Sequence, residues 1–184
     1  MNLIKTKIEG VVVIEPELFM DERGYFFESF NLNEFEENIG RVKFVQDNES
    51  MSPKGVIRGL HFQNPPHDQA KLVRCVKGSV LDVVVDIRKG SATYGKHISV
   101  QLSEQNKKQL FIPRGFAHGF SVLSENAIFS YKVDNYYAAD FDSGISPIDP
   151  DLKIDWIIDK KDVCLSDKDK KLTIFKNFES PFKL

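Results

Sequence analysis

Short strand patterns, separated by glycine, proline and small polar residues, make up nearly all of the chain after Val42. The clearest is Val80 to Ile87, where apolar residues alternate with Asp82 and Asp86. This alternation predicts one buried face and one face that carries carboxylates. Many short strands at near-regular spacing are typical of a β-sandwich or barrel. The sequence therefore predicts a mainly β fold, a small barrel with few helices.

Further strands are expected at residues 10–14, 96–102 and 109–112. Phe120 to Leu123 and Ala127 to Val133 also have strand composition, and a short polar turn separates them. Two strands joined by such a turn commonly pair as a hairpin. We therefore expect these two segments to be neighbours in one sheet.

One helix is predicted near the N-terminus, beginning after Asn31. Asn31 is a good N-cap residue, and Glu34 occupies the capping-box position three residues later. Phe35 and Ile39 share one face, and Gly40 ends the pattern.

Composition sets the outer limits of the function. A chain of 184 residues is expected to form one domain over residues 1–184. A net charge of -2 gives no electrostatic reason to expect nucleic acid or an anionic membrane as a partner. The chain shows no signal-peptide pattern and no apolar run that could span a bilayer, and Cys75 and Cys164 form no CxxC motif. We expect a cytoplasmic protein with free thiols.

The stretch around His61 and Lys71 concentrates the candidate chemistry. Both residues lie in strand patterns, so we expect them on paired strands, with Lys71 reaching His61 across a hairpin. Arg58 and His61 are three residues apart, and an ideal strand would point them to opposite faces. If both line one pocket, the strand must bulge or twist, and Gly59 is the natural place.

A metal site is the first alternative for histidines in a β-barrel. It would need a His-x-His or His-x-Asp/Glu pair and a distant histidine. The residue two after His61 is Gln63, and the residue two after His118 is Phe120, so the pattern is missing. We expect no metal. His118, which we expect in a tight loop, fits a structural and a functional role equally well.

Without a metal, His61 and Lys71 suit a general base beside a group that stabilises an oxyanion. Tyr131 offers a phenol that can donate a proton. A base and an acid on opposite faces of one substrate would permit epimerisation next to a carbonyl. Arg23 and Lys168, together with Arg58, would remain to bind a phosphorylated group. Taken singly, each cation also fits a solvated surface charge, and spacing alone does not decide.

Ordered motifs along almost the whole chain carry a family resemblance. They include Asp21–Glu28, Gln46–Asn48, Arg58–Gln63, Lys71–Arg74, Val83–Arg88, Ser91–Gly95, Pro113–Phe120, Tyr131–Lys132 and Leu165–Asp169. With these motifs the sequence closely resembles the dTDP-4-dehydrorhamnose 3,5-epimerases, cofactor-free enzymes of the cupin superfamily. The resemblance implies a cupin-type jelly-roll barrel with a few short helices. It also implies a homodimer in which strands near the N-terminus are shared across the interface.

The resemblance also implies roles for individual residues. His61 would be the base with Asp169 hydrogen-bonded behind it, Tyr131 the proton donor, and Lys71 the cation beside the oxygen of carbon 4. A set of polar, charged and aromatic residues would bind the nucleotide sugar, some of them from the partner subunit: Arg23, Phe26, Glu28, Gln46, Asn48, Arg58, His118, Tyr137, Asp142 and Lys168. Tyr137 would stack on the thymine.

Three positions depart from the family pattern. Asp142 stands where these enzymes usually carry a glutamate that contacts the nucleotide. Pro147-Ile148 replaces a customary tryptophan and its polar neighbour, and Ile157 replaces a proline after Trp156. These departures bear on nucleotide binding more than on the chemistry.

The leading expectation is conversion of dTDP-4-dehydro-6-deoxy-D-glucose to dTDP-4-dehydro-L-rhamnose, in dTDP-L-rhamnose biosynthesis. The alternatives are a mono-epimerase or an epimerase of another nucleotide-linked 4-keto-6-deoxy sugar, a non-catalytic cupin that binds sugar nucleotides, and a metal-dependent cupin oxygenase. The non-catalytic cupin would be expected to lack the base or the acid, whereas His61, Tyr131 and Asp169 are all present. A metal-dependent oxygenase would need the metal-ligand pattern that this sequence lacks.

Overall fold

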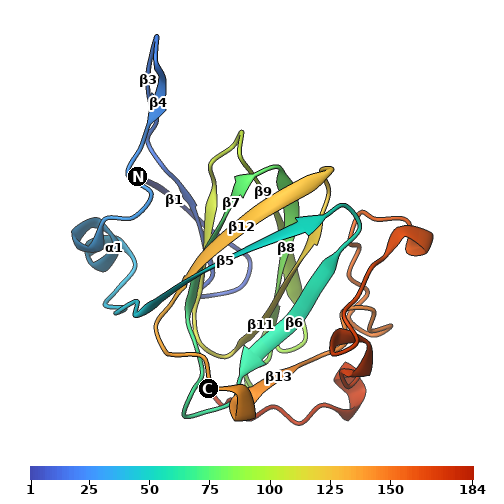
Figure 1. Ribbon diagram of the computed structural model, residues 1–184. Coiled ribbons are helices and arrows are strands. Elements are labelled where there is room, and N and C mark those ends of the chain that lie inside the picture. The colour runs from blue at the N-terminus through green and yellow to red at the C-terminus, as the bar shows by residue number, and fades with distance from the viewer.

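Two antiparallel sheets face each other and form a flattened barrel, as the computed structural model of residues 1–184 shows (Figure 1). The six-stranded sheet has the order β1 (Asn2–Lys5), β2 (Val12–Glu15), β10 (Gln109–Ile112), β7 (Lys71–Lys77), β12 (Asn126–Val133) and β5 (Gln46–Pro53). The five-stranded sheet has the order β13 (Asp142–Gly144), β6 (Ile57–Gln63), β11 (Phe116–Val122), β8 (Ser79–Asp86) and β9 (His97–Ser103). The expected jelly-roll architecture is confirmed.

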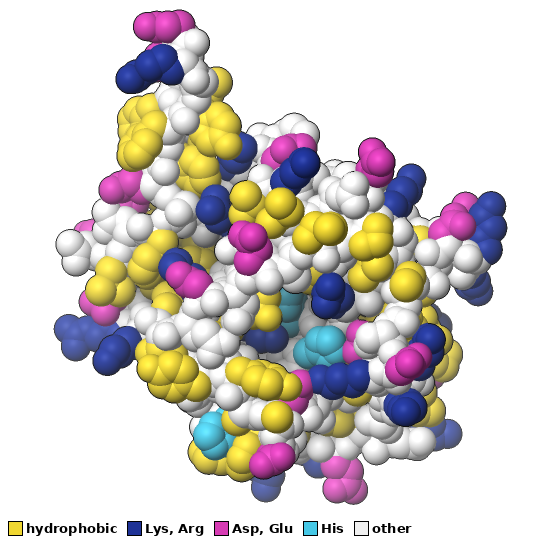
Figure 2. Space-filling model, in the orientation of Figure 1, with side chains coloured by type: hydrophobic (Ala, Val, Ile, Leu, Met, Phe, Trp, Pro, Cys, Tyr) yellow, Lys and Arg dark blue, Asp and Glu magenta, His cyan; other side chains and the backbone are white.

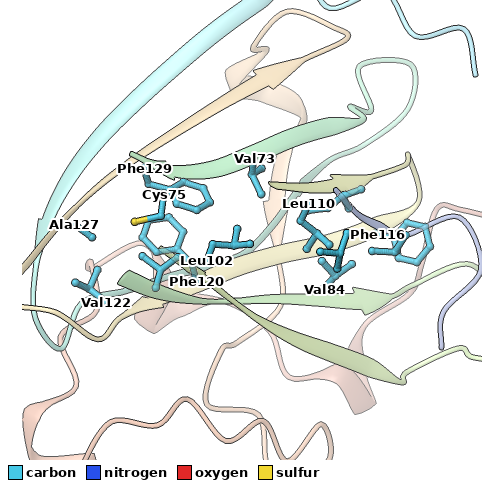
Figure 3. Packing of buried hydrophobic residues seen from close by; sticks show 14 of the residues in the cluster. Val73, Cys75, Val84, Leu102, Leu110, Phe116, Phe120, Val122, Ala127 and Phe129 are labelled. Atoms are coloured by element: carbon cyan, nitrogen blue, oxygen red, sulfur yellow. The ribbon is translucent and has the colours of Figure 1, made fainter. Parts of the chain in front are cut away.

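The main core lies between the two sheets (Figure 3). Val73 and Phe129 contribute from the six-stranded sheet, and Val84 and Phe120 from the five-stranded sheet, all nearly inaccessible to solvent. Phe120 and Phe129 stack with ring centroids 4.2 Å apart, which joins the sheets directly. Alternate residues of each strand point into this core, as the period of two in a β-strand requires.

Strand β8 is buried on both faces, which corrects the prediction of an exposed carboxylate face. Its second face packs under the irregular C-terminal region, where Trp156 and Phe182 belong to a second apolar cluster. Asp82 and Asp86 are fully buried. The carboxylates share their face with Val80 and Val84 of the main core and point into the barrel, whereas the C-terminal region covers the opposite, apolar face of the strand.

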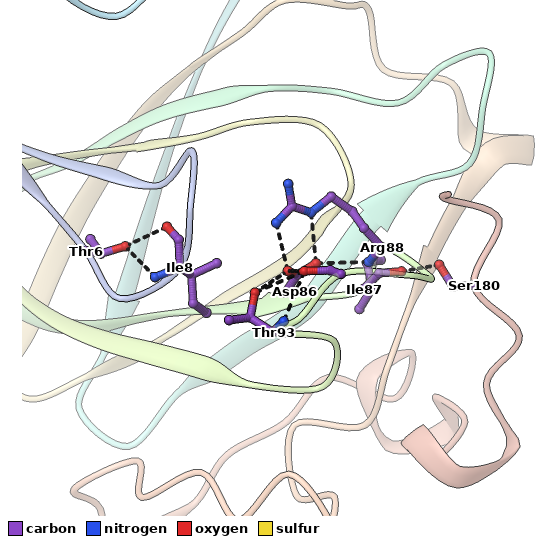
Figure 4. A network of polar contacts seen from close by, with 8 residues as sticks. Thr6, Ile8, Asp86, Ile87, Arg88, Thr93 and Ser180 are labelled. Carbon is purple, nitrogen blue, oxygen red and sulfur yellow. Dashed lines mark hydrogen bonds and ion pairs between the residues drawn. The ribbon is translucent and has the colours of Figure 1, made fainter. Parts of the chain in front are cut away.

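Hydrogen bonds compensate the burial of Asp86 (Figure 4). Its carboxylate accepts from the Arg88 guanidinium at 2.7 and 2.9 Å, and from the hydroxyls of Ser91 and Thr93 at 2.6 Å each. Burial acts to raise the pKa of Asp86, but these donors outweigh it and lower the pKa to about 2. Asp86 thus holds the turn that follows β8, and it is a structural residue.

The predicted helix is confirmed as α1 (Leu32–Asn38). The side chain of Asn31 accepts from the backbone amides of Asn33 and Glu34 at 3.1 and 3.3 Å. Phe35 packs edge-on against Phe111 of β10, at 5.2 Å between ring centroids, so the helix covers the outer face of the six-stranded sheet. None of the helices has the length and apolar character needed to cross a membrane.

Strands β11 and β12 do not pair, which corrects the predicted hairpin. β11 lies between β6 and β8, whereas β12 lies between β5 and β7 in the other sheet. The short turn between them carries the chain from one sheet to the facing one. Such crossings define a jelly roll, and turn residues alone do not distinguish them from a hairpin.

The small hairpin of β3 (Phe19–Asp21) and β4 (Gly24–Phe26) projects away from the barrel (Figure 1). Its aromatic and sulfur-containing side chains are exposed: Phe19 by 54%, Met20 by 70% and Phe26 by 65%. Contiguous exposed apolar surface of this kind marks an interaction site.

Candidate active site

A polar cavity of about 330 Å³ opens at one end of the barrel, and side chains from both sheets line it. On the space-filling surface, histidine side chains lie in a hollow near the middle of the face shown (Figure 2). The lining residues are Gln46, Asn48, His61, Phe62, Gln63, Gln69, Lys71, Tyr131, Tyr137 and Asp142. A larger groove of about 780 Å³ lies where β5 turns into β6, but it contains none of the predicted site residues. The chemistry therefore belongs to the smaller cavity.

His61 and Asp169 form a hydrogen-bonded pair at the cavity wall. Nε2 of His61 lies 2.5 Å from Oδ1 of Asp169, although 108 residues separate them in sequence. Asp169 is almost fully buried, and its backbone amide donates to the Ser166 hydroxyl at 3.0 Å. Burial acts to raise the pKa of Asp169, but the hydrogen bonds from His61 and Ser166 outweigh it, and the pKa is lowered. Asp169 is thus an ionised carboxylate that fixes the imidazole.

Strand β6 bulges between Arg58 and His61, at the glycine that the sequence indicated, although only His61 of the two lines the cavity. His61 pairs with His118 of β11 and Arg58 with Phe120, so the register shifts by one residue between these pairs. Gly59 has φ +131, and a Cβ there would lie 2.5 Å from Cα of Gly119. Only glycine fits this close approach of two strands.

Lys71 faces His61 across the cavity and does not pair with it through a hairpin. β7 belongs to the six-stranded sheet and β6 to the five-stranded sheet, so the predicted strand pairing is wrong. Burial lowers the pKa of Lys71 to about 8, and the carboxylates of Asp142 and Asp82 oppose this shift. An ammonium in such a site interacts strongly with any charge that develops beside it.

His118 forms a second histidine–carboxylate pair with Asp82. Nε2 of His118 lies within hydrogen-bond distance of the Asp82 carboxyl group, at 2.8 Å from Oδ2, and both side chains are buried. His118 lies on β11 and not in the loop predicted for it. Burial lowers its pKa although Asp82 opposes the shift, so His118 is neutral at pH 7. The sequence interpretation missed Asp82 at this site, although a lone acid within a run of valines was an available signal.

Tyr131 lies on β12, in the sheet opposite His61, and lines the same cavity. Burial raises the pKa of its phenol, and the nearby Arg58 guanidinium opposes this shift. The phenol therefore keeps its proton at neutral pH. Arg58 itself donates to the Ser52 hydroxyl at 2.9 Å and lies outside the cavity lining.

The rim of the cavity is a network of polar side chains. Gln46 donates to Asn48 at 2.9 Å, and Tyr137 Oη donates to Asp142 at 3.0 Å. Lys168 also forms an ion pair with Asp142. All five of these residues were predicted to bind substrate, and the structure brings them together.

Two glutamines at the cavity were missed. Gln63 donates to the backbone oxygens of His67 and Tyr136 at 2.6 and 3.2 Å, and it accepts from the Ala138 amide. Gln69 donates to the backbone oxygen of Asn135 at 2.7 Å. Both shape the loop that follows β12, and nothing in their local sequence indicated this.

Three predicted substrate-binding residues lie away from the cavity of their own chain. Arg23 pairs with Asp21 at the tip of the projecting hairpin, with 84% of its side chain exposed. Phe26 belongs to the same hairpin. Glu28 accepts from Asn31 at 3.2 Å, beside helix α1.

No three His, Cys, Asp or Glu side chains are grouped so that they could hold a metal ion. The departures at residues 147, 148 and 157 lie outside the cavity lining. The Pro147 carbonyl accepts from the Trp156 indole at 2.7 Å, and Ile148 and Ile157 are exposed.

Comparison with known proteins agrees with this geometry. Residues 5–177 match the family model for dTDP-4-dehydrorhamnose 3,5-epimerase. The chain is 56% identical over 170 residues to the dTDP-4-dehydrorhamnose 3,5-epimerase of Shigella flexneri, covering 92% of this chain and 93% of that protein. It is 41% identical over 157 residues to a dTDP-4-dehydrorhamnose 3-epimerase of Streptomyces niveus, covering 85% and 76%.

Solved structures give the same result. The dTDP-4-dehydrorhamnose 3,5-epimerase of Elizabethkingia anophelis is 51% identical, with a TM-score of 0.92, over 96% of this chain and 97% of that one. A dTDP-6-deoxy-D-glucose-3,5-epimerase of Legionella pneumophila, in complex with dTDP-4-keto-L-rhamnose, is 47% identical, with a TM-score of 0.93, over 97% and 94%. Fold, cavity and relatives together define an isomerase of the epimerase class with a cupin-like barrel. The chain belongs to the dTDP-4-dehydrorhamnose 3,5-epimerase family.

Proposed function

We propose that this protein inverts carbons 3 and 5 of dTDP-4-dehydro-6-deoxy-D-glucose, giving dTDP-4-dehydro-L-rhamnose, without a cofactor. The observation that carries the proposal is a histidine–aspartate pair and a phenol on opposite walls of one cavity, with a half-buried ammonium among them. Purified protein should convert the dTDP-linked substrate to this product, and NMR of the reaction mixture should detect the product. A preference for the UDP-linked sugar would overturn the nucleotide assignment.

His61 is the base in this proposal. Asp169 holds the proton on Nε2 of His61, because an ionised carboxylate accepts only from a ring N–H. Nδ1, the other ring nitrogen, then carries the lone pair that takes the substrate proton. As the imidazole becomes positive, the nearby Asp169 carboxylate stabilises it.

Lys71 stabilises the enolate that proton removal creates. The carbon 4 ketone makes the protons on carbons 3 and 5 acidic, because the resulting charge moves to the carbonyl oxygen. An ammonium beside that oxygen interacts more strongly with the enolate than with the ketone, which lowers the barrier. His118 and Asp82 are packed close by and help to set the field around Lys71.

Tyr131 returns a proton on the other face of the sugar ring. It stands on the sheet opposite His61, and its raised pKa keeps the phenol protonated until the enolate forms. Removal by His61 and return by Tyr131 on opposite faces produce inversion at a carbon. The same two groups serve both carbons if the sugar ring turns between the two steps and if, before the second step, His61 releases its proton to water and Tyr131 takes one from water.

The dTDP moiety is held at the rim and by a second copy of the chain. Gln46, Asn48, Tyr137 and Lys168 lie at or beside the cavity mouth, with Tyr137 as the stacking surface for thymine. The projecting hairpin, with its exposed apolar side chains, is well shaped to reach a neighbouring subunit. In a homodimer it would bring the partner's copy of Arg23 and Phe26 to the nucleotide.

Mixing two inactive variants tests the shared site. We expect His61→Asn and the double variant Arg23→Ala/Phe26→Ala each to lose activity. Random exchange of subunits should then restore about a quarter of wild-type activity, because half of the dimers are mixed and each has one complete site. Sedimentation of both variants and the wild type as dimers is the control. A fully active monomer at assay concentration, or no recovery after subunit exchange, would contradict the shared site.

A mono-epimerase is the second candidate. The relative named as a 3-epimerase favours it, because that relative shares 41% of its aligned residues with this chain. The products differ at carbon 5, so NMR distinguishes the two.

A further inference from the structure

One carboxylate, that of Asp142, holds two residues at the rim of the cavity. Tyr137 Oη donates to Oδ2 of Asp142 at 3.0 Å, and Nζ of Lys168 forms an ion pair with the same oxygen. The Asp142 side chain is only 14% exposed, whereas that of Lys168 is 51% exposed. An ion pair with one largely buried partner and a second donor is held more firmly than an isolated surface pair.

The Asp142–Lys168 ion pair closes a ring of contacts around His61. Asp142 lies on β13, whose backbone pairs with β6 so that Gly144 lies opposite His61. Lys168 immediately precedes Asp169, which binds His61 at 2.5 Å. The ring runs from β6 through β13 and the ion pair to Asp169, and from there back to the imidazole.

The segment that carries Asp169 depends on this ring for its position. Backbone hydrogen bonds anchor it at both ends, from Ile57 to Cys164 at 3.0 Å and from Ser146 to Thr173 at 2.8 Å. Between these anchors the segment is a short 3₁₀ turn, and its polar ties to the sheets are made by the side chains of Lys168 and Asp169. Breaking the Lys168 tie leaves the Asp169 carboxylate, which accepts from His61 and from the Gly59 backbone amide, as the remaining polar contact of this turn with β6.

We propose that Asp142 is a positioning residue for the epimerisation: through Lys168 it fixes the turn that carries Asp169, and so orients the imidazole of His61. The inference rests on the proposed function, since it takes His61 as the base. The family resemblance leads us to expect that Asp142 contacts the nucleotide. The inference adds that Asp142 also influences proton removal. An aspartate, one methylene shorter than the glutamate usual in the family, is long enough for this positioning role, because Tyr137 and Lys168 both contact its Oδ2.

Replacement of Asp142 separates the two roles. Asp142→Asn keeps an acceptor for Tyr137 and removes the charge that Lys168 needs. We expect kcat to fall by about 10- to 100-fold, the loss typical of a misplaced catalytic group. Exchange of substrate protons with deuterated solvent should fall in parallel, because the base itself is disturbed, whereas loss of a nucleotide contact alone would raise KM and leave kcat and exchange unchanged. Asp142→Glu restores the charge and should recover most of kcat.

Two further variants make the test specific. Asp140→Asn, two residues earlier on an exposed turn, is the matched control and should behave as wild type. Lys168→Met should lower kcat as Asp142→Asn does, and the double variant should be no worse than the poorer single one, because both changes break one tie. Thermal unfolding checks that each variant folds, and Lys168→Met carries the test if Asp142→Asn does not fold.

The outcomes separate this inference from the function. Wild-type protein that fails to epimerise the dTDP sugar would refute the proposed function. Active wild type, with Asp142→Asn changing only KM, would refute the positioning role alone. Additive losses in the double variant, or solvent exchange that persists while epimerisation falls, would also overturn it.

Discussion

Replacing Tyr131 by phenylalanine is expected to lower epimer formation by about 100- to 10,000-fold, the usual contribution of general acid catalysis. The change removes the phenolic oxygen and its proton and keeps the ring, which packs against the main core. Folding and nucleotide binding should therefore change little. Circular dichroism and binding of dTDP are the controls for this variant.

Solvent exchange shows whether Tyr131 acts on the face opposite the base. His61 can still remove a proton and return it on its own side in the Tyr131→Phe variant. Exchange of substrate protons with deuterated water should therefore fall less than epimer formation. A strictly parallel fall, or no fall in either rate, would show that Tyr131 is not the opposite-face acid.

Replacing Lys71 by alanine is expected to lower kcat by about 100- to 1000-fold, as loss of one oxyanion donor usually does. Nucleotide affinity should be nearly unchanged, because the ammonium stabilises charge that exists only in the transition state and the enolate. An unchanged kcat with a raised KM would instead assign Lys71 to substrate binding.

The pKa of Lys71 adds a pH signature to this prediction. Because burial lowers that pKa to about 8, the ammonium is present below pH 8 and is lost as the pH rises through this value. We expect kcat/KM of the wild type to decline above about pH 8. The residual activity of Lys71→Ala should lack this decline. A flat profile for the wild type up to pH 10 would contradict the assignment.

Local chemistry made part of the fold predictable. Asn31 caps α1 because its side chain reaches the backbone amides two and three residues away. Donors and acceptor lie within four consecutive residues, so the local sequence was enough to predict this cap. Likewise, Gly59 marked the position at which the strand bulges, because a glycine between Arg58 and His61 permits the irregular backbone found there. The role of Asp169 came only from the family resemblance, because 108 residues separate it from His61 and no local pattern relates the two.

The wrong predictions concern strand pairing and buried faces, which depend on the topology of the two sheets. The turn after β11 leads into the facing sheet, and Lys71 reaches the cavity from a sheet that does not contain His61. Asp82 was not expected inside the barrel, because the strand pattern does not show which face of β8 turns toward the facing sheet. Its partner, His118, lies on the neighbouring strand and is fixed only by the register of β8 and β11.

The central claim is a cofactor-free inversion of two carbons, and one NMR experiment tests it most directly. The protein is dialysed against EDTA and incubated with dTDP-4-dehydro-6-deoxy-D-glucose in deuterated water. We expect an undiminished rate and dTDP-4-dehydro-L-rhamnose that carries deuterium at both carbon 3 and carbon 5. Inversion and deuterium at one carbon only, or activity that disappears on dialysis and returns with a divalent ion, would contradict the account.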